Sequence, residues 1–389
     1  MIVGAGYAGL PCALELARQK NAKRTRITLV NREPRQELVC DLYRALRNGR
    51  PELFPFLKTL RKHGIHFVEG SAHGFEPEAK LLHVRGDRAQ SIAYDELVVA
   101  TGSKAKLPQI DGLQELLDGP SPLDRRVFLF RNNTQVQALR LALRRIDWSP
   151  ESRPGGRDLF CVIVGAGTTG LEVAGELATF RGRNPACRIV LVDGKPDILP
   201  DFPMLARNIY KRDLRRARVE TVLGSPATKL TEKELHIENG QVIPWDLLIL
   251  CSGGRSTSTL RAFGPAASDE GLAASANLGI AGWPHHHVIG DLARPDGVGL
   301  PLTAQLAGQS GRFVARKIAA ALSTGRTPRD AFEANDLGSL VSFGPYAGVG
   351  RLGGAPESPL GRLVSPFVFG PPVDELKRAA KIRYLWGLR

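Results

Sequence analysis

Two glycine clusters in this chain have the spacing of a phosphate-binding turn. The pattern Gly-x-Gly-x-x-Gly occurs at Gly4, Gly6 and Gly9, and again at Gly165, Gly167 and Gly170. The surrounding segments, 1–17 and 162–178, match at 11 of 17 positions. The first two glycines of such a pattern permit a tight turn beside a pyrophosphate, and the third lets helix and strand pack closely. One copy is weak, because glycine loops also serve as plain turns. Two copies predict two bound dinucleotides and hydride transfer between them.

A polar residue follows each glycine pattern at the distance of a ribose-binding side chain. Asp193 lies 23 residues after Gly170. Its carboxylate can accept hydrogen bonds from both ribose hydroxyls and repels a 2′-phosphate, which favours NADH over NADPH. Asn31, followed by Arg32, lies 22 residues after Gly9. Because asparagine is an uncharged and weaker acceptor than the usual carboxylate, the first site departs from the common pattern.

The elements that position these residues follow from the apolar runs. We expect helices from the first glycine loop to residue 18, at 133–146 and at 301–322, and strands at 25–30, 91–100, 159–164, 188–192, 245–251 and 287–291. Continuous apolar strands are typical of parallel sheets buried on both faces, whose ligands bind at the carboxyl ends. Segment 150–156 reads as a linker. The prediction is an α/β fold of two Rossmann-like domains, the second inserted in the first. The expected divisions are 1–112, 113–275 and 276–325, followed by a C-terminal segment, 326–389.

Composition narrows the class of protein. The chain has 389 residues, of which 43% are hydrophobic and 24% charged, as is ordinary for a globular protein. No apolar run reaches the ~18 residues of a transmembrane helix, and Met1 leads directly into the first glycine loop, so we expect no leader peptide. The five cysteines show no C-x-x-C spacing, which argues against a zinc site or a dithiol centre and favours the cytoplasm. Cys40 lies where disulfide reductases carry a redox pair but has no partner nearby.

The net charge of +14 has two interpretations. Arginine-rich runs such as 207–218 are usually solvated helix faces, but they are also attracted to anionic membrane surfaces. No nucleic-acid-binding module is present, so nucleic acid is not an expected partner. The histidines at 285–287 invite a metal hypothesis. Consecutive residues of an extended segment point to alternate faces, which favours a structural role and no metal site.

Several further motifs occur in the order seen in one flavoprotein family. They are Ala100-Thr101-Gly102, Ile289-Gly290-Asp291, and the stretch from Thr303 to Gln309, together with Glu172 and Glu176 in the second glycine segment. With the two fingerprints, the chain resembles the type II NADH:quinone oxidoreductases along essentially its whole length, including the segment 337–344.

The resemblance implies a non-proton-pumping enzyme that passes a hydride from NADH to FAD and two electrons to a quinone of the menaquinone or ubiquinone type. FAD would be lined by Gly4, Gly6, Gly9, Asn31, Arg32, Thr101, Gly102, Asp291 and Ala304. NADH would be lined by Gly165, Gly167, Gly170, Asp193 and Gly253, with Glu172 near the nicotinamide. Gln305 and Gln309 would lie on the quinone side. The family also implies a C-terminal membrane-associating segment on the inner face of the cell membrane, and it permits a homodimer.

Each functional interpretation has a structural alternative. Glu172 could simply be a first-turn glutamate that favours a helix N-terminus. Gln305 and Gln309, one helical turn apart, could donate to a quinone carbonyl or satisfy flavin and backbone groups. For the whole chain, one alternative is a soluble NAD(P)H flavoprotein reductase whose positive surface steers a ferredoxin-like acceptor. Another is a dinucleotide sensor without catalysis, since fold alone does not fix function.

Overall fold

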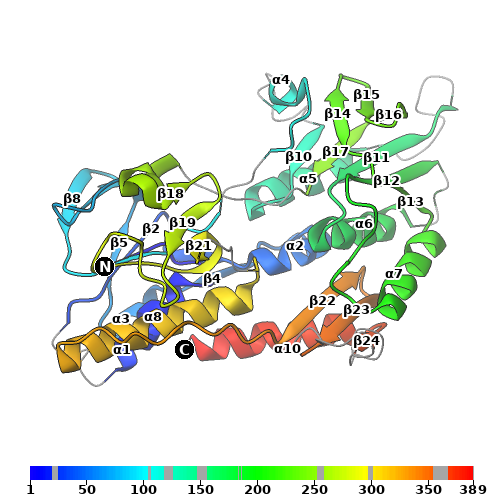
Figure 1. Ribbon diagram of the computed structural model, residues 1–389. Coiled ribbons are helices and arrows are strands. Elements are labelled where there is room, and N and C mark those ends of the chain that lie inside the picture. The colour runs from blue at the N-terminus through cyan, green and yellow to red at the C-terminus, as the bar shows by residue number, and fades with distance from the viewer. Residues whose placement is uncertain are drawn as a thin grey trace.

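The computed structural model describes residues 1–19, 25–103, 107–117, 126–146, 156–182, 184, 186–251, 258–296, 301–353 and 367–388. This part of the chain forms two lobes side by side, each built around a five-stranded sheet (Figure 1). All strand pairs in these two sheets are parallel. The predicted α/β fold with parallel sheets is confirmed.

The first lobe carries the first glycine loop on its central strand. The sheet runs in the order β20 (His286–Val288), β9 (Leu97–Val99), β1 (Ile2–Val3), β2 (Thr28–Asn31) and β5 (His66–Glu69). Helices α1 (Gly9–Arg18) and α8 (Ala304–Thr324) pack against each other beside it. Their approach depends on Gly311, because a Cβ atom there would lie 2.2 Å from the carbonyl oxygen of Ala8.

The second lobe repeats this plan around the second glycine loop. Its sheet has the order β10 (Val127–Leu129), β17 (Leu247–Leu250), β11 (Leu159–Val164), β12 (Cys187–Asp193) and β13 (Val219–Leu223). The glycine-loop strand is again central, between the strand that follows its helix and a strand from much later in the chain. Helices α5 (Asn133–Arg145), α6 (Thr168–Arg181) and α7 (Met204–Arg216) belong to this lobe (Figure 1). The central strands of both sheets are apolar and buried, as is typical of parallel sheets covered on two faces.

Smaller elements decorate the lobes. Three are short helices: α2 (Leu42–Asn48), α3 (Leu57–Lys62) and α4 (Leu113–Leu117). Strands β3 (Arg35–Glu37) and β4 (Leu53–Pro55) form a pair. Three small sheets consist of β6 (Ser71–Glu76), β7 (Leu81–Arg85) and β8 (Ala89–Ala93); of β14 (Ala227–Leu230), β15 (Glu234–Ile237) and β16 (Val242–Pro244); and of β18 (Ala267–Ser268), β19 (Gly271–Ala274) and β21 (Ala293–Pro295). The expected strand 91–100 is therefore wrong as one element. Its first residues pair in β8 and its last in β9, and Glu96 between them binds two histidines.

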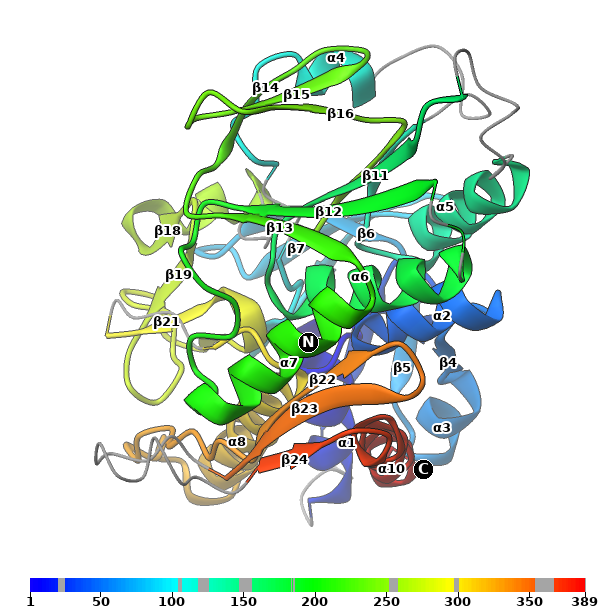
Figure 2. The ribbon, with the colours of Figure 1, turned by 90° about the vertical axis from the view of Figure 1, so that its right-hand side faces the viewer.

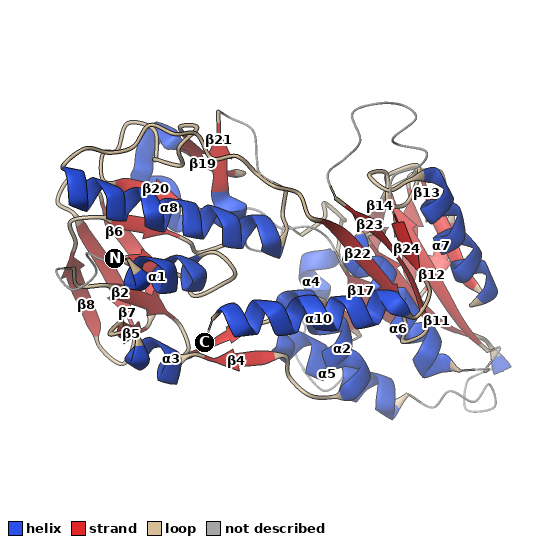
Figure 3. Ribbon diagram, turned by 90° about the horizontal axis from the view of Figure 1, so that it is seen from below, coloured by secondary structure: helices blue, strands red, loops and turns tan. Residues whose placement is uncertain are grey.

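The C-terminal segment folds across both lobes. Strands β22 (Gly338–Phe343), β23 (Ala347–Leu352) and β24 (Phe367–Phe369) form an antiparallel sheet against α6 and α7, and α10 (Pro372–Gly387) lies beside them (Figure 2). Seen from below, α10 runs from this sheet toward the first lobe (Figure 3). There Tyr384 packs on Tyr7 with ring centroids 4.9 Å apart, and Leu388 is buried. No helix within the described ranges is long and apolar enough to cross a membrane.

Candidate functional site

The first glycine loop is shaped by three glycines with three different tasks. Gly4 has φ +102°, and a Cβ atom there would lie 2.3 Å from the carbonyl oxygen of Ala100. A Cβ atom on Gly9 would lie 1.9 Å from the carbonyl oxygen of Gly4, so this glycine lets the helix pack on the turn. Gly6 meets nothing within 4 Å. Its open face is where a pyrophosphate can approach the backbone at the N-terminus of α1.

The second loop has the same construction. Gly165 has φ +109°, and a Cβ atom on Gly170 would lie 1.8 Å from the carbonyl oxygen of Gly165. Gly167, like Gly6, has no atom within 4 Å of an added Cβ. The two loops therefore share a turn, an open phosphate-side glycine and a packed glycine, in that order.

The polar residues at the ends of β2 and β12 also play equivalent parts. The Asn31 side chain accepts a hydrogen bond from the Ala5 amide at 3.0 Å, and Asp193 accepts one from the Ala166 amide at 2.6 Å. Asp193 also accepts from the Lys195 amide at 2.8 Å. Asn31 thus retains the bond that fixes its loop and lacks only the charge. This explains how asparagine can stand where a carboxylate was expected.

The space beyond Asn31 is polar and open. Arg32, Glu69, Arg85 and Asp87 are among the residues that line a surface hollow of about 230 Å³ there. This hollow lies at the carboxyl ends of β2 and β5, at the side of the first loop where the outer part of a dinucleotide would extend.

The inner end of the first site contains an unsatisfied polar group. The hydroxyl oxygen of Thr101 is buried without a hydrogen-bond partner in the described structure, and Gly102 beside it has φ +66°. The Ser103 hydroxyl donates to Asp291 at 3.0 Å. Ala304 is the first residue of α8, whose N-cap Thr303 accepts from the Leu306 amide. A buried hydroxyl, a carboxylate and a helix N-terminus suit a ligand that bears hydroxyl and carbonyl groups, as the flavin part of FAD does.

Glu172 lies at the junction of the two lobes and the C-terminal segment. Its carboxylate is buried, forms an ion pair with Lys377 of α10, and accepts from the Ser342 amide of β22 at 3.1 Å. Burial raises the pKa of Glu172, and Lys377 opposes that shift. It therefore does not act as an exposed first-turn glutamate.

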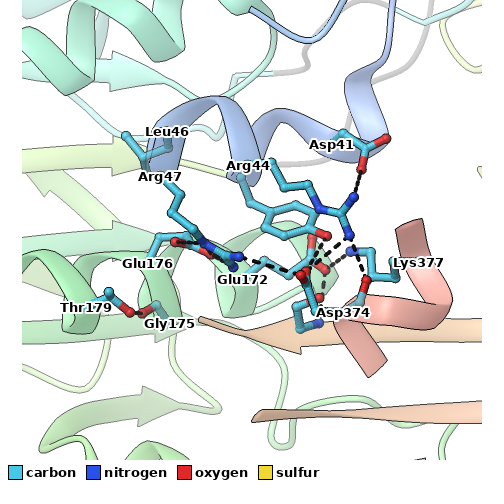
Figure 4. Close-up of polar contacts among 12 residues, drawn as sticks. Asp41, Arg44, Leu46, Arg47, Glu172, Gly175, Glu176, Thr179, Asp374 and Lys377 are labelled. Carbon is cyan, nitrogen blue, oxygen red and sulfur yellow. Dashed lines mark hydrogen bonds and ion pairs between the residues drawn. The ribbon is translucent and has the colours of Figure 1, made fainter. Parts of the chain in front are cut away.

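Glu172 belongs to a larger charged cluster, shown in Figure 4. One turn further along α6, Glu176 binds Arg47 of α2 through both carboxylate oxygens, with its Nε atom 2.9 and 3.1 Å away. Asp374 of α10 accepts from Arg44 at 3.2 Å and from the Tyr43 hydroxyl at 3.2 Å. The cluster joins α2, α6 and α10 through paired charges, as buried ionic groups require.

The two glutamines of α8 bind the backbone that leaves the first lobe. The Gln305 amide nitrogen donates to Gly338 O at 2.9 Å and to Asp336 at 3.1 Å, and its oxygen accepts from the Leu337 amide at 3.0 Å. Gln309 exchanges bonds of 2.7 and 2.9 Å with the backbone of Asn335. Both side chains therefore bind backbone groups, which is one of the two roles considered for them. Their role toward a quinone stays a prediction.

Other sequence-predicted features fall in different places. Gly253 lies outside the described residues. Glu96 binds His285 at 2.6 Å and His287 at 3.0 Å, so these histidines are tied to the edge of the first sheet. Among the described residues, no group of three or more His, Cys, Asp or Glu side chains is arranged to hold a metal ion. Cys40 is free and exposed.

Sequence reasoning missed the residues that α10 and α2 bring to this junction. Lys377 and Lys381 lie in the C-terminal segment that the family resemblance associates with the membrane, and their side chains pair with Glu172 and Glu52. A signal was present, because two acids one turn apart on the apolar helix α6 require buried cations. The cations that meet these two acids are Arg47 at Glu176 and Lys377 at Glu172.

Comparisons with known proteins agree with this architecture. A family model described as pyridine nucleotide-disulphide oxidoreductase matches residues 1–311. The type II NADH:quinone oxidoreductase of Staphylococcus saprophyticus is 24% identical over 376 residues, covering 91% of this chain and 89% of its own length.

Two solved structures have the same fold. NDH2 from Plasmodium falciparum, in complex with NADH, superposes with a TM-score of 0.79 at 16% identity, covering 100% of this chain and 95% of that one. The sulfide:quinone oxidoreductase of Aquifex aeolicus gives a TM-score of 0.79 at 15% identity, covering 100% and 90%. At these identities the likeness concerns the fold alone.

Proposed function

Because this chain belongs to the pyridine nucleotide-disulphide oxidoreductase family, we propose that it is an FAD-dependent NADH:quinone oxidoreductase that does not pump protons. The observation that carries the proposal is the pair of glycine loops, each with its second glycine facing open space. One chain with two such loops can hold a nicotinamide donor and a flavin together. The relatives named as type II NADH:quinone oxidoreductases support a quinone as acceptor.

When bound, FAD accepts a hydride from NADH and passes two electrons to the acceptor. The protein supplies the binding and orientation. We assign FAD to the first loop with Asn31, Arg32, Thr101, Asp291 and Ala304. NADH is assigned to the second loop with Asp193, whose charge favours a free ribose 2′-hydroxyl. Gly253 is included in this second assignment.

We further assign to Glu172 the holding of a proton near the junction of the two sites. Its Oε1 atom receives both the Ser342 amide and the Lys377 ammonium group. Because burial raises its pKa, this carboxyl can bind a proton closer to neutral pH than an exposed glutamate can. Gln305 and Gln309 fix the segment that leads from α8 to β22, so they position the acceptor side of the site through the backbone.

Anaerobic mixing with NADH tests the proposal. The flavin absorbance near ~450 nm should bleach, and addition of a short-chain menaquinone or ubiquinone analogue should restore it. A purified protein that holds no flavin would contradict the proposal. A reduced flavin that is reoxidised by ferredoxin and by no quinone would instead select a protein acceptor.

We also propose that the protein binds the inner face of the cell membrane through α10 and the sheet β22–β24. Large exposed side chains gather on these elements: Tyr346, Phe369, Leu376, Ile382 and Trp386 are 39–78% exposed. Tryptophan and tyrosine favour the membrane interface, and the net charge of +14 favours anionic lipids.

Sedimentation with phosphatidylglycerol/phosphatidylcholine vesicles tests this surface. Trp386→Ser should weaken binding, whereas Leu141→Ser, at an exposed apolar position on helix α5, should not. Equal binding of both variants would contradict the assignment. The same sedimentation without vesicles shows whether two copies associate as a homodimer.

A further inference from the structure

An arginine from the second lobe reaches into the first lobe at the proposed flavin site. Arg131 follows β10, the edge strand of the second sheet, and its Nη2 atom donates to the carbonyl oxygen of Ser103 at 3.0 Å and to the Ser103 hydroxyl at 2.8 Å. Ser103 in turn donates its hydroxyl to Asp291 at 3.0 Å. Hydrogen bonds through Arg131, Ser103 and Asp291 therefore connect the carboxyl ends of strands from both sheets.

This arginine is part-buried and lies near a carboxylate. Burial lowers the pKa of Arg131, and the nearby Asp291 carboxylate opposes that shift. Both of its hydrogen bonds use one nitrogen, and within the described structure they go to Ser103 alone. The part-buried guanidinium thus holds Ser103 in place and brings a positive charge near the Asp291 carboxylate.

The groups around Arg131 independently indicate a ligand. Thr101, two residues before Ser103, has a buried hydroxyl with no partner in the described part of the chain. Gly102 between them has φ +66°, which aims this short loop in a direction that other residues rarely adopt. The bonds from Arg131 to Ser103 therefore fix the loop that carries the Thr101 hydroxyl.

We propose that Arg131 is a positioning residue of the flavin site, contributed by the NADH-binding part of the chain. It holds the Ser103 hydroxyl as a donor to one oxygen of Asp291, and it leaves the other oxygen to accept from the sugar-alcohol chain of FAD. Its charge also stabilises the electrons that FAD gains, since preorganised cations act strongly where water is excluded. The inference rests on the proposed binding of FAD in the first site.

The consequence is that FAD affinity depends on how the two lobes meet. Arg131→Met removes the cation and both bonds to Ser103. Loss of a charge-assisted bond at such a site should raise the Kd for FAD about 10- to 100-fold. It should also make the flavin reduction potential more negative. Arg131→Lys keeps the charge and should lie between the wild type and Arg131→Met.

A matched control is provided by the opposite end of the same strand. Arg126 precedes β10, donates to the carbonyl oxygen of Glu232 and lies over the Trp245 ring. It is the same residue type as Arg131, is more exposed, and stands at the other end of the strand from Ser103. Arg126→Met should leave the FAD affinity and potential unchanged. Ser103→Ala, a milder change, should weaken FAD binding while the charge stays in place.

The test is a titration of each apoprotein with FAD, followed by measurement of the flavin potential and of NAD⁺ binding. A wild type that does not bind FAD would overturn the proposed function itself. If the wild type binds FAD but Arg131→Met matches Arg126→Met in affinity and potential, only the role of Arg131 is overturned. Equal loss of FAD and NAD⁺ binding with a lowered apoprotein melting temperature would show a general brace and also overturn it.

Discussion

Removing the partner of the most buried glutamate should make the stability of the protein depend on pH. The Glu176 side chain is 1% exposed, and Arg47 is the cation that binds both of its oxygens. Burial raises the pKa of Glu176, and Arg47 opposes that effect. In Arg47→Met the carboxylate would be left unpaired in the interior. Breaking such a buried pair costs about 3–5 kcal/mol.

The sign of the pH dependence follows from the direction of the pKa shift. Without Arg47, the folded-state pKa of Glu176 rises further above its unfolded value. The stability of Arg47→Met is therefore fully retained only below the unfolded pKa and is lost as the pH rises toward the folded pKa. For one proton the slope is at most about 1.4 kcal/mol per pH unit. The deficit relative to the wild type should grow from mildly acidic to neutral pH.

The assay is urea unfolding with saturating FAD, at about pH 5.5, 6.5 and 7.5. Arg188→Met is the control, because Arg188 also forms a two-point pair with a glutamate, Glu220, but both side chains are more than 40% exposed. It should lose at most about 1 kcal/mol at every pH. The double variant Arg47→Met/Glu176→Gln should recover much of the lost stability, since position 176 then carries no charge. A loss no larger than that of Arg188→Met, or one independent of pH, would refute the reasoning.

Three other changes test separate parts of the structure. Gly6→Val should preserve folding and lower FAD affinity at least ~10-fold. Gly9→Ala places a Cβ atom 1.9 Å from a carbonyl oxygen and should destabilise the fold by about 3 kcal/mol. Measurements of flavin content and of thermal unfolding distinguish the two effects. Asp193→Ala should raise the Kd for NADH about 10-fold while flavin content stays normal, and equal loss of both cofactors would show that the two sites are wrongly divided. Burial opposes ionisation of Glu96, but hydrogen bonds from His287 and His285 outweigh it and lower its pKa to about 2. Glu96 thus stabilises the fold above its unfolded pKa, and this contribution disappears as the pH falls through the folded pKa. Glu96→Gln should cost about 1–2 kcal/mol near neutral pH, with the difference shrinking in acid; an acid titration of unfolding that shows parallel curves would count against it.

The parts of the fold that were predicted from sequence are those governed by short-range rules. The glycine spacing, the buried strands and the helix 133–146, observed as Asn133–Arg145, depend on neighbouring residues and on a period that is visible in the sequence. The family was also predicted correctly. The small sheets were missed because their strands are short and partly polar, so they lack the apolar runs that marked the two central sheets.

The polar junction could be predicted only in part. Glu172 was selected, but its partners lie 170 and 205 residues away in the chain, at Ser342 and Lys377. No local pattern records such a distance. The acids of α6 did show that cations were needed, while the choice among 53 lysines and arginines depends on tertiary packing. In the same way, Gln305 was recognised as unusual, although its partners in 335–338 became evident only from the fold.

The C-terminal helix has two faces with different requirements. Its inner face contributes Asp374, Lys377 and Lys381 to buried or half-buried ion pairs, and its outer face exposes Ile382 and Trp386. Moving the helix away would remove Lys377 from the buried carboxylate of Glu172, and the cost of breaking such a pair exceeds the gain from one or two apolar contacts with lipid. If a membrane binds the outer face of α10, the helix therefore stays docked on the rest of the protein. Contact with lipid would orient the two lobes relative to the bilayer while the charges around Glu172 remain paired.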